Sequence, residues 1–189
     1  MTRSLLALGL VPALAAAAAA HPLPNLRYDR TVHVRVDATG ATVRYALELN
    51  DWTMVLDGKD LLTAEEKREL SGQMAFGKKY AEKKAPLIAD NLRATLDGKP
   101  VMFKVARVEV EPERDHLRVH FQFRAGWDRS RVGVLRTFHF EDQNFEDRSG
   151  VITLTLDRAD DSVTVMDLEE PADLRGKSPL DYKPGDEKK

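Results

Sequence analysis

His21 is the residue whose type and position offer the most specific chemistry. It follows Ala18-Ala19-Ala20, a small-x-small pattern that a signal peptidase accepts, so a cut after Ala20 would make His21 the first residue of the mature chain. Its amine nitrogen and its ring Nδ1 could then chelate one metal ion, and a second imidazole would complete a nitrogen site suited to Cu(II). The sequence therefore predicts His21 as a metal ligand, with Cu or Ni as the candidate cofactor. The competing interpretation is that a histidine merely follows the cut.

The second imidazole would come from His116, which follows Asp115, or from His120, and the sequence does not decide between them. On one strand these two histidines would lie about 13 Å apart, at about 3.3 Å per residue, which is too far for one metal ion. His33, His116, His120 and His139 all fall on the polar faces of expected strands. The alternative for each of them is a solvent-facing histidine without a ligand.

A second candidate metal site is the segment Glu141–Asp147, in which four of seven residues are acidic. Carboxylate oxygens suit calcium or a divalent transition metal. The alternative interpretation is a solvated loop between two strands.

The first twenty residues have the layout of a secretory signal. Arg3 supplies a basic start, an apolar run extends from Ser4 to Ala20, and the run ends in small residues. We therefore expect the protein to be exported, to the periplasm or the extracellular space. The alternatives are an uncleaved membrane anchor and a buried helix, but the run is at the short edge of what can span a bilayer and Pro12 interrupts it.

The composition argues against several function classes. The chain has 29 basic and 31 acidic residues, and loss of Arg3 with the signal would leave a net charge near −3. That balance argues against nucleic-acid binding, which needs a basic surface. After the signal, no segment is apolar enough to span a membrane, so we expect no transmembrane span in the mature chain. The sequence has no cysteine, which excludes thiol catalysis and thiolate metal sites.

No catalytic motif stands out. The sequence lacks G-x-S-x-G, a P-loop, a glycine-rich dinucleotide turn and H-E-x-x-H. None of its serines lies in a nucleophile motif, and its carboxylates are too many to pair from sequence. We therefore predict a non-catalytic protein, and a secreted enzyme of unknown class is the third of the functions considered.

Most of the chain alternates apolar and polar residues with period two, which is typical of strands. Hairpins are expected over 31–50 and, across Asp97-Gly98, over 92–110, with a bulge or bend near Ala106-Arg107. In the expected strand 116–123, Leu117, Val119, Phe121 and Phe123 face the core. The remaining expected strands cover residues 132–140, 151–156 and 163–166.

One helix is expected between the two hairpins. Thr63 and Glu66 have the spacing of a capping box, and apolar or small residues follow at helical intervals up to Ala81. The pattern predicts a helix from about residue 64 to 84, which Pro86 ends or kinks. Gly72 and Gly77 would weaken this helix, unless a close packing contact requires small residues there.

Together these patterns predict a mainly β (α+β) fold, an antiparallel β-sandwich with one helical insertion around residues 63–85. The expected organisation is a signal peptide over 1–20, a single domain over 21–183 and a disordered polar tail over 184–189.

Five segments carry a family resemblance, and they occur in the family's order. They are His21-Pro-Leu-Pro-Asn-Leu26, the strand Val43–Leu49, the Asp-Gly hairpin Leu92–Pro100, the acidic segment Asp142–Gly150 and the closing segment Asp173–Asp181. In these segments the chain resembles the soluble exported domain that precedes the membrane helices of nickel/cobalt permease-like proteins. It departs from that family at Pro24, where the family prefers Gly, and at Val151, where it prefers Trp.

The resemblance implies an extracytoplasmic module near a membrane system, with a role in metal handling. The membrane half of such proteins has no counterpart in the sequence, so we expect no transport by this chain alone. The preferred hypothesis is a non-catalytic accessory or interaction module that docks on a membrane or envelope protein, and its mark would be an exposed apolar patch. The alternative is a small metal-binding (Cu/Ni) protein that uses His21, and its mark would be a second histidine within reach.

Overall fold

The computed structural model describes residues 26–114, 116–128 and 136–158. His21, the expected signal over 1–20, the expected strand 163–166 and the expected tail over 184–189 lie outside these residues. The described chain is mainly β, with two sheets and three helices, so the expected sandwich-like α+β class is confirmed.

The first layer is a five-stranded sheet in the order β5-β6-β2-β1-β8. All of its pairs are antiparallel except β1 with β8, which run parallel. The alternating residues of the expected hairpin form β1 and β2, and Thr39 lies in the turn between them. The strands of this sheet are β1 Asp29–Asp37, β2 Gly40–Asn50, β5 Lys104–Pro112, β6 His116–Gly126 and β8 Ile152–Arg158.

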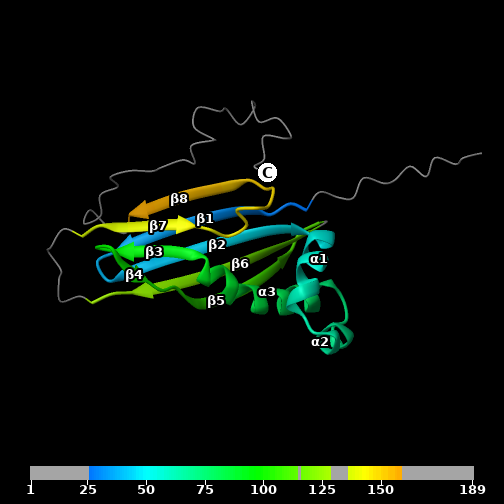
Figure 1. The fold of residues 1–189 in the computed structure, drawn as a ribbon. Coiled ribbons are helices and arrows are strands. Elements are labelled where there is room, and N and C mark those ends of the chain that lie inside the picture. Colours follow the sequence, from blue (N-terminus) through cyan, green and yellow to red (C-terminus); the bar gives the residue numbers. More distant parts are fainter. Residues whose placement is uncertain (1–25, 115, 129–135, 159–189) are drawn as a thin grey trace, which may run out of the picture.

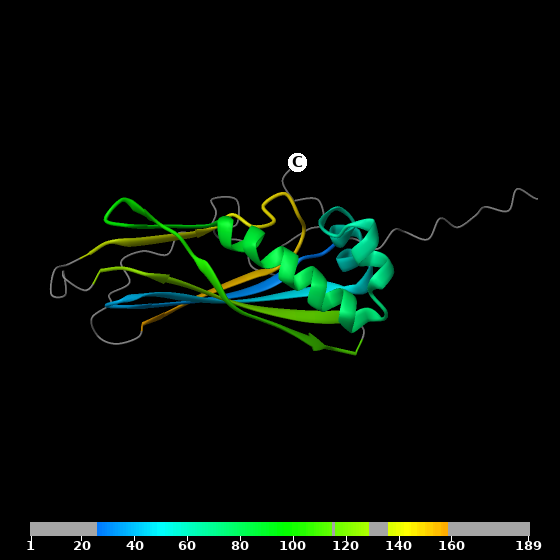
Figure 2. The same ribbon diagram turned by 90° about the horizontal axis from the view of Figure 1, so that it is seen from below.

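The second layer combines a helix with a small sheet. Figure 2 shows α3 lying along one face of the five-stranded sheet and leading into the smaller sheet, whose strand order is β4-β3-β7. The two short helices gather at one end of the large sheet, as Figure 1 shows. These elements are α1 Asp51–Leu61, α2 Ala64–Glu69, α3 Gln73–Asp90, β3 Leu92–Leu96, β4 Lys99–Val101 and β7 Phe138–Asp142.

The helical insertion is larger than the sequence indicated, with three helices between residues 51 and 90 in place of one around 63–85. Asn50 ends β2 and also caps α1, because its side chain accepts a hydrogen bond from the Thr53 N–H at 2.7 Å. The capping box is confirmed, since Thr63 and Glu66 exchange bonds of 3.0 and 3.1 Å, but it begins the short α2. Pro86 does not end α3, which continues to Asp90 because Ile88 and Ala89 are buried against the sheet.

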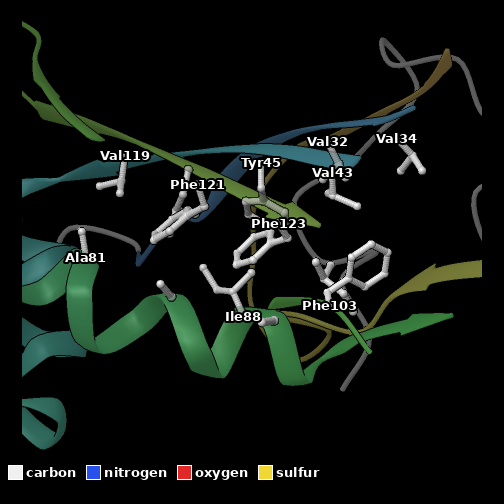
Figure 3. Packing of buried hydrophobic residues seen from close by; sticks show 14 of the residues in the cluster. Val32, Val34, Val43, Tyr45, Ala81, Ile88, Phe103, Val119, Phe121 and Phe123 are labelled. Atoms are coloured by element: carbon white, nitrogen blue, oxygen red, sulfur yellow. The ribbon is translucent and has the colours of Figure 1, made fainter. Parts of the chain in front are cut away.

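The core lies between the two layers and contains the residues that the strand pattern placed inside. Tyr45, Phe121 and Phe123 point from the large sheet toward Ile88 on α3, as Figure 3 shows. Leu117, Val119, Phe121 and Phe123 are each at most 1% exposed, so the predicted phase of this strand is confirmed. The bulge or bend predicted near Ala106-Arg107 is also present, as a register shift between Val105 and Arg107 where β5 pairs with β6.

The two glycines of the expected helix have different roles. Gly77 lies inside α3, and a Cβ there would come within 2.5 Å of Leu117 Cδ1, so a close packing contact does require a small residue. Gly72 lies outside the helix, at the N-cap of α3, with a φ of 85° that favours glycine.

Candidate functional site

A buried polar centre connects the two layers. Arg30 on β1 and Tyr45 on β2 point inward from the large sheet, and Asp142 ends β7 in the small sheet. Arg30 Nε lies 3.7 Å from Asp142 Oδ2, and the two side chains are 12% and 2% exposed. The Arg30 Nε, Tyr45 hydroxyl and Asp142 Oδ2 atoms make no hydrogen bond with any described residue.

Asn144 supplies the hydrogen bonds that Asp142 does have. The Asn144 backbone N–H and side-chain amide donate to Asp142 Oδ1 at 3.1 and 2.8 Å, and Arg30 donates to the Asn144 carbonyl. Burial raises the pKa of Asp142 above its ordinary value, although the bonds from Asn144 and the charge of Arg30 oppose that rise. Burial also raises the pKa of Tyr45. The buried surroundings of Asp142 therefore disfavour its negatively charged form.

A second polar group lies beside the first and joins α1 to α3. The Tyr80 hydroxyl donates to Asp57 Oδ2 at 2.6 Å, and Lys84 Nζ lies 2.8 Å from the same oxygen. Lys84 Nζ also lies 4.8 Å from the centroid of the Phe145 ring, which stacks on Tyr28 with ring centroids 4.6 Å apart. These contacts fix the segment that follows β7 against both the helix and the sheet.

The tyrosines of this group should make stability sensitive to alkaline pH. Burial, reinforced by the charge of Asp57, raises the pKa of Tyr28 to about 12, and burial also raises that of Tyr80. An unfolded tyrosine ionises near pH 10, so the unfolded chain loses these protons first and the free energy of unfolding should fall as pH rises from about 10 toward 12. Urea denaturation between pH 8 and about 11.5 measures this loss.

A Tyr28→Phe variant is the control for that experiment. Phenylalanine has no proton to lose, so its stability should fall less steeply with pH than that of the wild type. Equal slopes for the two proteins would show that Tyr28 ionises in the folded state as easily as in the unfolded chain.

The acidic segment Glu141–Asp147 is not simply a solvated loop. Glu141, Glu146 and Asp147 are exposed, but Asp142 faces Arg30 and Asn144 is 3% exposed, with its amide donating to the Ile88 carbonyl at 3.2 Å. The acidic side chains of this segment therefore point in different directions, some to solvent and one into the protein. Throughout the described ranges, no three His, Asp or Glu side chains lie close enough together to hold a metal ion.

Gly150 closes this segment onto the start of β1. Its φ is 155°, and a Cβ there would come within 2.2 Å of the Tyr28 carbonyl oxygen. The Tyr28 backbone is held in place, because its N–H donates to the Ser149 carbonyl at 2.9 Å. We expect Gly150→Ala to lower the free energy of unfolding by about 2 kcal/mol, because both the conformation and the clash disfavour a side chain. Thermal denaturation measures this loss, and Gly126→Ala, where the nearest atom would be 3.9 Å away, is the control.

The described histidines lie on outer faces, as their positions in the sequence predicted. His120 Nε2 is 3.2 Å from Glu111 Oε2, and His116 Nε2 is 4.0 Å from Glu48 Oε2. His33 opposes Arg44 on β2, and His139 opposes Thr95 on β3. The structure therefore does not bring these four side chains together, and the proposed ligand His21 lies outside the described residues.

The outward face of α1 is apolar. Trp52, Val55 and Leu56 are 47%, 47% and 37% exposed, and their spacing of three and four residues places them on one side of the helix. Thr53, Met54 and Gly58 on the opposite side are buried. We call the three exposed residues the α1 apolar face, and it is a surface feature that the sequence did not reveal, because the segment was not expected to be helical.

The polar centre is closed to substrates, since Asp142, Tyr45 and Tyr80 are each at most 2% exposed. A groove of about 390 Å³ lies elsewhere, between α3 and β5, and its lining residues are Lys78, Glu82, Val108, Glu109, Val110 and Glu111. An active site usually combines a cleft with groups of perturbed pKa. Here the groove and the perturbed groups are in different places, which favours a structural role for the polar centre.

No protein-family model, no curated protein and no solved structure matches this chain. The resemblance to the exported domain of nickel/cobalt permease-like proteins therefore remains a hypothesis based on the five sequence segments alone. In the part of the chain that the structure describes, no helix is both long and apolar enough to cross a membrane.

Proposed function

We propose that this protein is a non-catalytic, exported accessory domain that docks on a membrane or envelope protein of a metal-transport-like system through its α1 apolar face. The observation that carries this proposal is the exposure of Trp52, Val55 and Leu56 together on one side of a short helix. Contiguous apolar surface of this kind marks interaction sites, and tryptophan is one of the residues enriched among those that dominate binding energy.

The charges around this face favour a protein over a lipid surface as the partner. Helix α1 exposes two carboxylates, Asp51 and Asp60, and one cation, Lys59. Its third carboxylate, Asp57, points inward and pairs with Lys84. A helix that lies on an anionic bilayer is rich in Lys and Arg, so α1 has the opposite charge balance. The partner surface should therefore be an apolar depression with basic residues at its rim.

A photocrosslinking amino acid at position 55 tests the proposal in the envelope of the source cell. Leu87 on α3 is the matched control position, because it is 43% exposed and is also apolar. We expect one defined adduct from position 55 and none from position 87, with excess wild-type protein competing for it and a Trp52→Ser/Leu56→Ser variant failing to compete. No adduct, or equal adducts at both positions, would contradict the proposal.

The same Trp52→Ser/Leu56→Ser variant separates a surface role from a structural one. Because both side chains are partly buried, each replacement should lower the free energy of unfolding by about 1–2 kcal/mol, which leaves the domain folded. A variant that competes poorly because it is unfolded would show a much larger loss in urea denaturation.

The second candidate function is metal binding by His21, and one feature of the topology favours it. His116 begins β6 opposite Asn50, at the end of the large sheet where β1 also begins. His21 precedes Leu26 by five residues, which can span about 17 Å. Calorimetric titration of the mature protein with Cu(II) and Ni(II) tests this function, against a version with one extra N-terminal Ala. Tight one-to-one binding that the extension abolishes would support it, and binding that ignores the extension would contradict it.

A further inference from the structure

The two outermost strands of the large sheet differ in their free edges. Strand β5 has a register shift after Val105 and ends at Pro112, and both features hinder the addition of another strand. It also carries four exposed charged side chains, Lys104, Arg107, Glu109 and Glu111. Strand β8 lies at the other edge, as Figure 1 shows, and its sequence from Ile152 to Leu156 contains only isoleucine, leucine and threonine. One edge of the sheet therefore disfavours a further strand, and the other favours it.

Strand β8 exposes apolar side chains that belong to the inward face of the sheet. Its register with β1 places Ile152 beside Arg30 and Leu154 beside Val32. Val32 is 0% exposed, yet Leu154 and Ile152 are 46% and 38% exposed, so the second layer covers β1 but not this part of β8. Among the described strands β8 pairs only with β1. Its other edge therefore presents backbone N–H and C=O groups that no described strand pairs.

The side chains of β8 suit a second copy of the same strand. If two copies pair antiparallel about Leu154, Ile152 lies opposite the partner's Leu156, and Thr153 lies opposite the partner's Thr155. The inward faces then form a continuous apolar stripe and the outward faces form threonine pairs, both of which stabilise antiparallel strands. No charged residue occurs from Ile152 to Leu156, so no like charges face each other across the twofold axis.

A peptide from another protein matches this edge less well than a second copy does. Domains that add a peptide to a sheet edge select it through pockets that receive its alternate side chains. The groove of about 390 Å³ lies beside β5, at the opposite edge of the sheet, and its lining residues do not include any from β8. A strand of identical sequence needs no such groove, because the apolar stripe and the threonine pairs are complementary to themselves.

We propose that the protein forms a twofold-symmetric dimer in which the β8 strands of two copies pair antiparallel and join the two large sheets into one. Each copy uses its β8 edge once, so the assembly closes at two copies, and the charged, irregular β5 edges do not extend it into a fibre. The exposed inward residues of β8 become shielded between the second layers of the two copies. This contact does not involve the α1 apolar face, so the dimer and the proposed function can fail independently.

Sedimentation velocity of the mature protein over a wide concentration range tests for the dimer. The wild type should shift from monomer to dimer as its concentration rises. Leu154→Lys should weaken dimerisation at least about a hundredfold, because two like charges would face each other across the twofold axis. Val105→Lys is the matched control, since Val105 is an apolar residue of the β5 edge with a similar exposure of 43%, and it should leave dimerisation unchanged.

A mixture of Leu154→Lys and Leu154→Glu separates loss of the interface from loss of the fold. Each variant alone should remain monomeric, whereas equal amounts of the two should form a heterodimer, because opposite charges then face each other. Urea denaturation should show that both variants are folded, since Leu154 is partly exposed in a single copy. Folded variants that stay monomeric when mixed would overturn the proposal.

A distance measurement tests the arrangement, because the chain has no cysteine and a single one can be introduced for labelling. Gln122 on β6 faces outward, and its register partners lead across the sheet to Thr155 on β8. In the proposed dimer, two nitroxides on Gln122→Cys are separated by seven strand spacings, about 34 Å. Pairing through the β5 edges would leave three spacings, about 14 Å. Pulsed electron paramagnetic resonance should therefore give the longer distance, and the shorter one would overturn the proposal.

A wild-type protein that is monomeric at every concentration would also overturn the proposal. Amide hydrogen exchange would then identify what occupies the β8 edge. Slow exchange of the β8 amides that point away from β1 would show that another segment of the same chain covers the edge. Fast exchange of these amides would show that the edge is open to a different protein.

Discussion

Phe121→Ala is expected to lower the free energy of unfolding by about 3–5 kcal/mol. Phe121 is 1% exposed and lies on β6, which has a neighbouring strand on both sides. Its ring meets Tyr45 edge-on at a centroid distance of 6.3 Å and stacks on Phe123 at 6.0 Å. Alanine removes both aromatic contacts and leaves a cavity between the sheet and α3 that the two layers cannot close fully.

Urea denaturation measures this loss, and Gln122→Ala is the matched control because its side chain points to the opposite face of the same strand. The control should change the free energy of unfolding by less than about 0.5 kcal/mol. A loss below about 1 kcal/mol for Phe121→Ala would mean that this part of the core can rearrange, contrary to its close packing.

The strand patterns were predictable because their cause is local. Val32, Val34 and Val36 alternate with polar residues, and such a sequence buries one face only when it pairs as a strand. The Asp97-Gly98 turn was predictable for a similar reason, since both residues have positive φ, at 52° and 74°. In these segments the local preference and the tertiary structure agree.

The helices were harder to predict, because long-range packing decides their limits. Asp51–Leu61 has no strong helical pattern, but Tyr80 and Lys84 on α3 bind its Asp57 and so hold α1 in place. Pro86 remains inside α3 because the burial of Ala85 and Ile88 outweighs the hydrogen bond that proline cannot make. A sequence read locally contains neither of these contacts.

Two features, the buried polar centre and the α1 apolar face, could be found only once the three-dimensional arrangement of the elements was known. Arg30 has the same parity as Val32, and Asp142 has the same parity as Phe138 and Phe140, so each charge interrupts an inward-facing apolar series. That interruption was a signal of the buried polar centre, but pairing the two residues required the arrangement of the layers. The same holds for the α1 apolar face, whose residues share one side only because the segment is helical.

Asp142→Ala is expected to cost about 3 kcal/mol, whereas Asp142→Asn should stay within about 1 kcal/mol of the wild type. Alanine leaves both Asn144 donors without their acceptor in a buried site, and each such loss costs about 1–3 kcal/mol. The asparagine Oδ1 can still accept both bonds. Its missing charge costs little, because burial already disfavours the carboxylate, as the raised pKa of Asp142 indicates.

The pH dependence of the Asp142→Asn difference provides an independent test of the same argument. A raised pKa means that the folded state binds the proton at higher pH than the unfolded chain does, so Asp142 should contribute increasing stability as pH falls through its native pKa toward the ordinary aspartate value of 3.8. The free energy of unfolding of the wild type should therefore rise relative to Asp142→Asn over that range. If Asp142→Asn instead costs as much as Asp142→Ala at neutral pH, the ion pair with Arg30 holds the two layers together, and the hydrogen bonds from Asn144 are secondary.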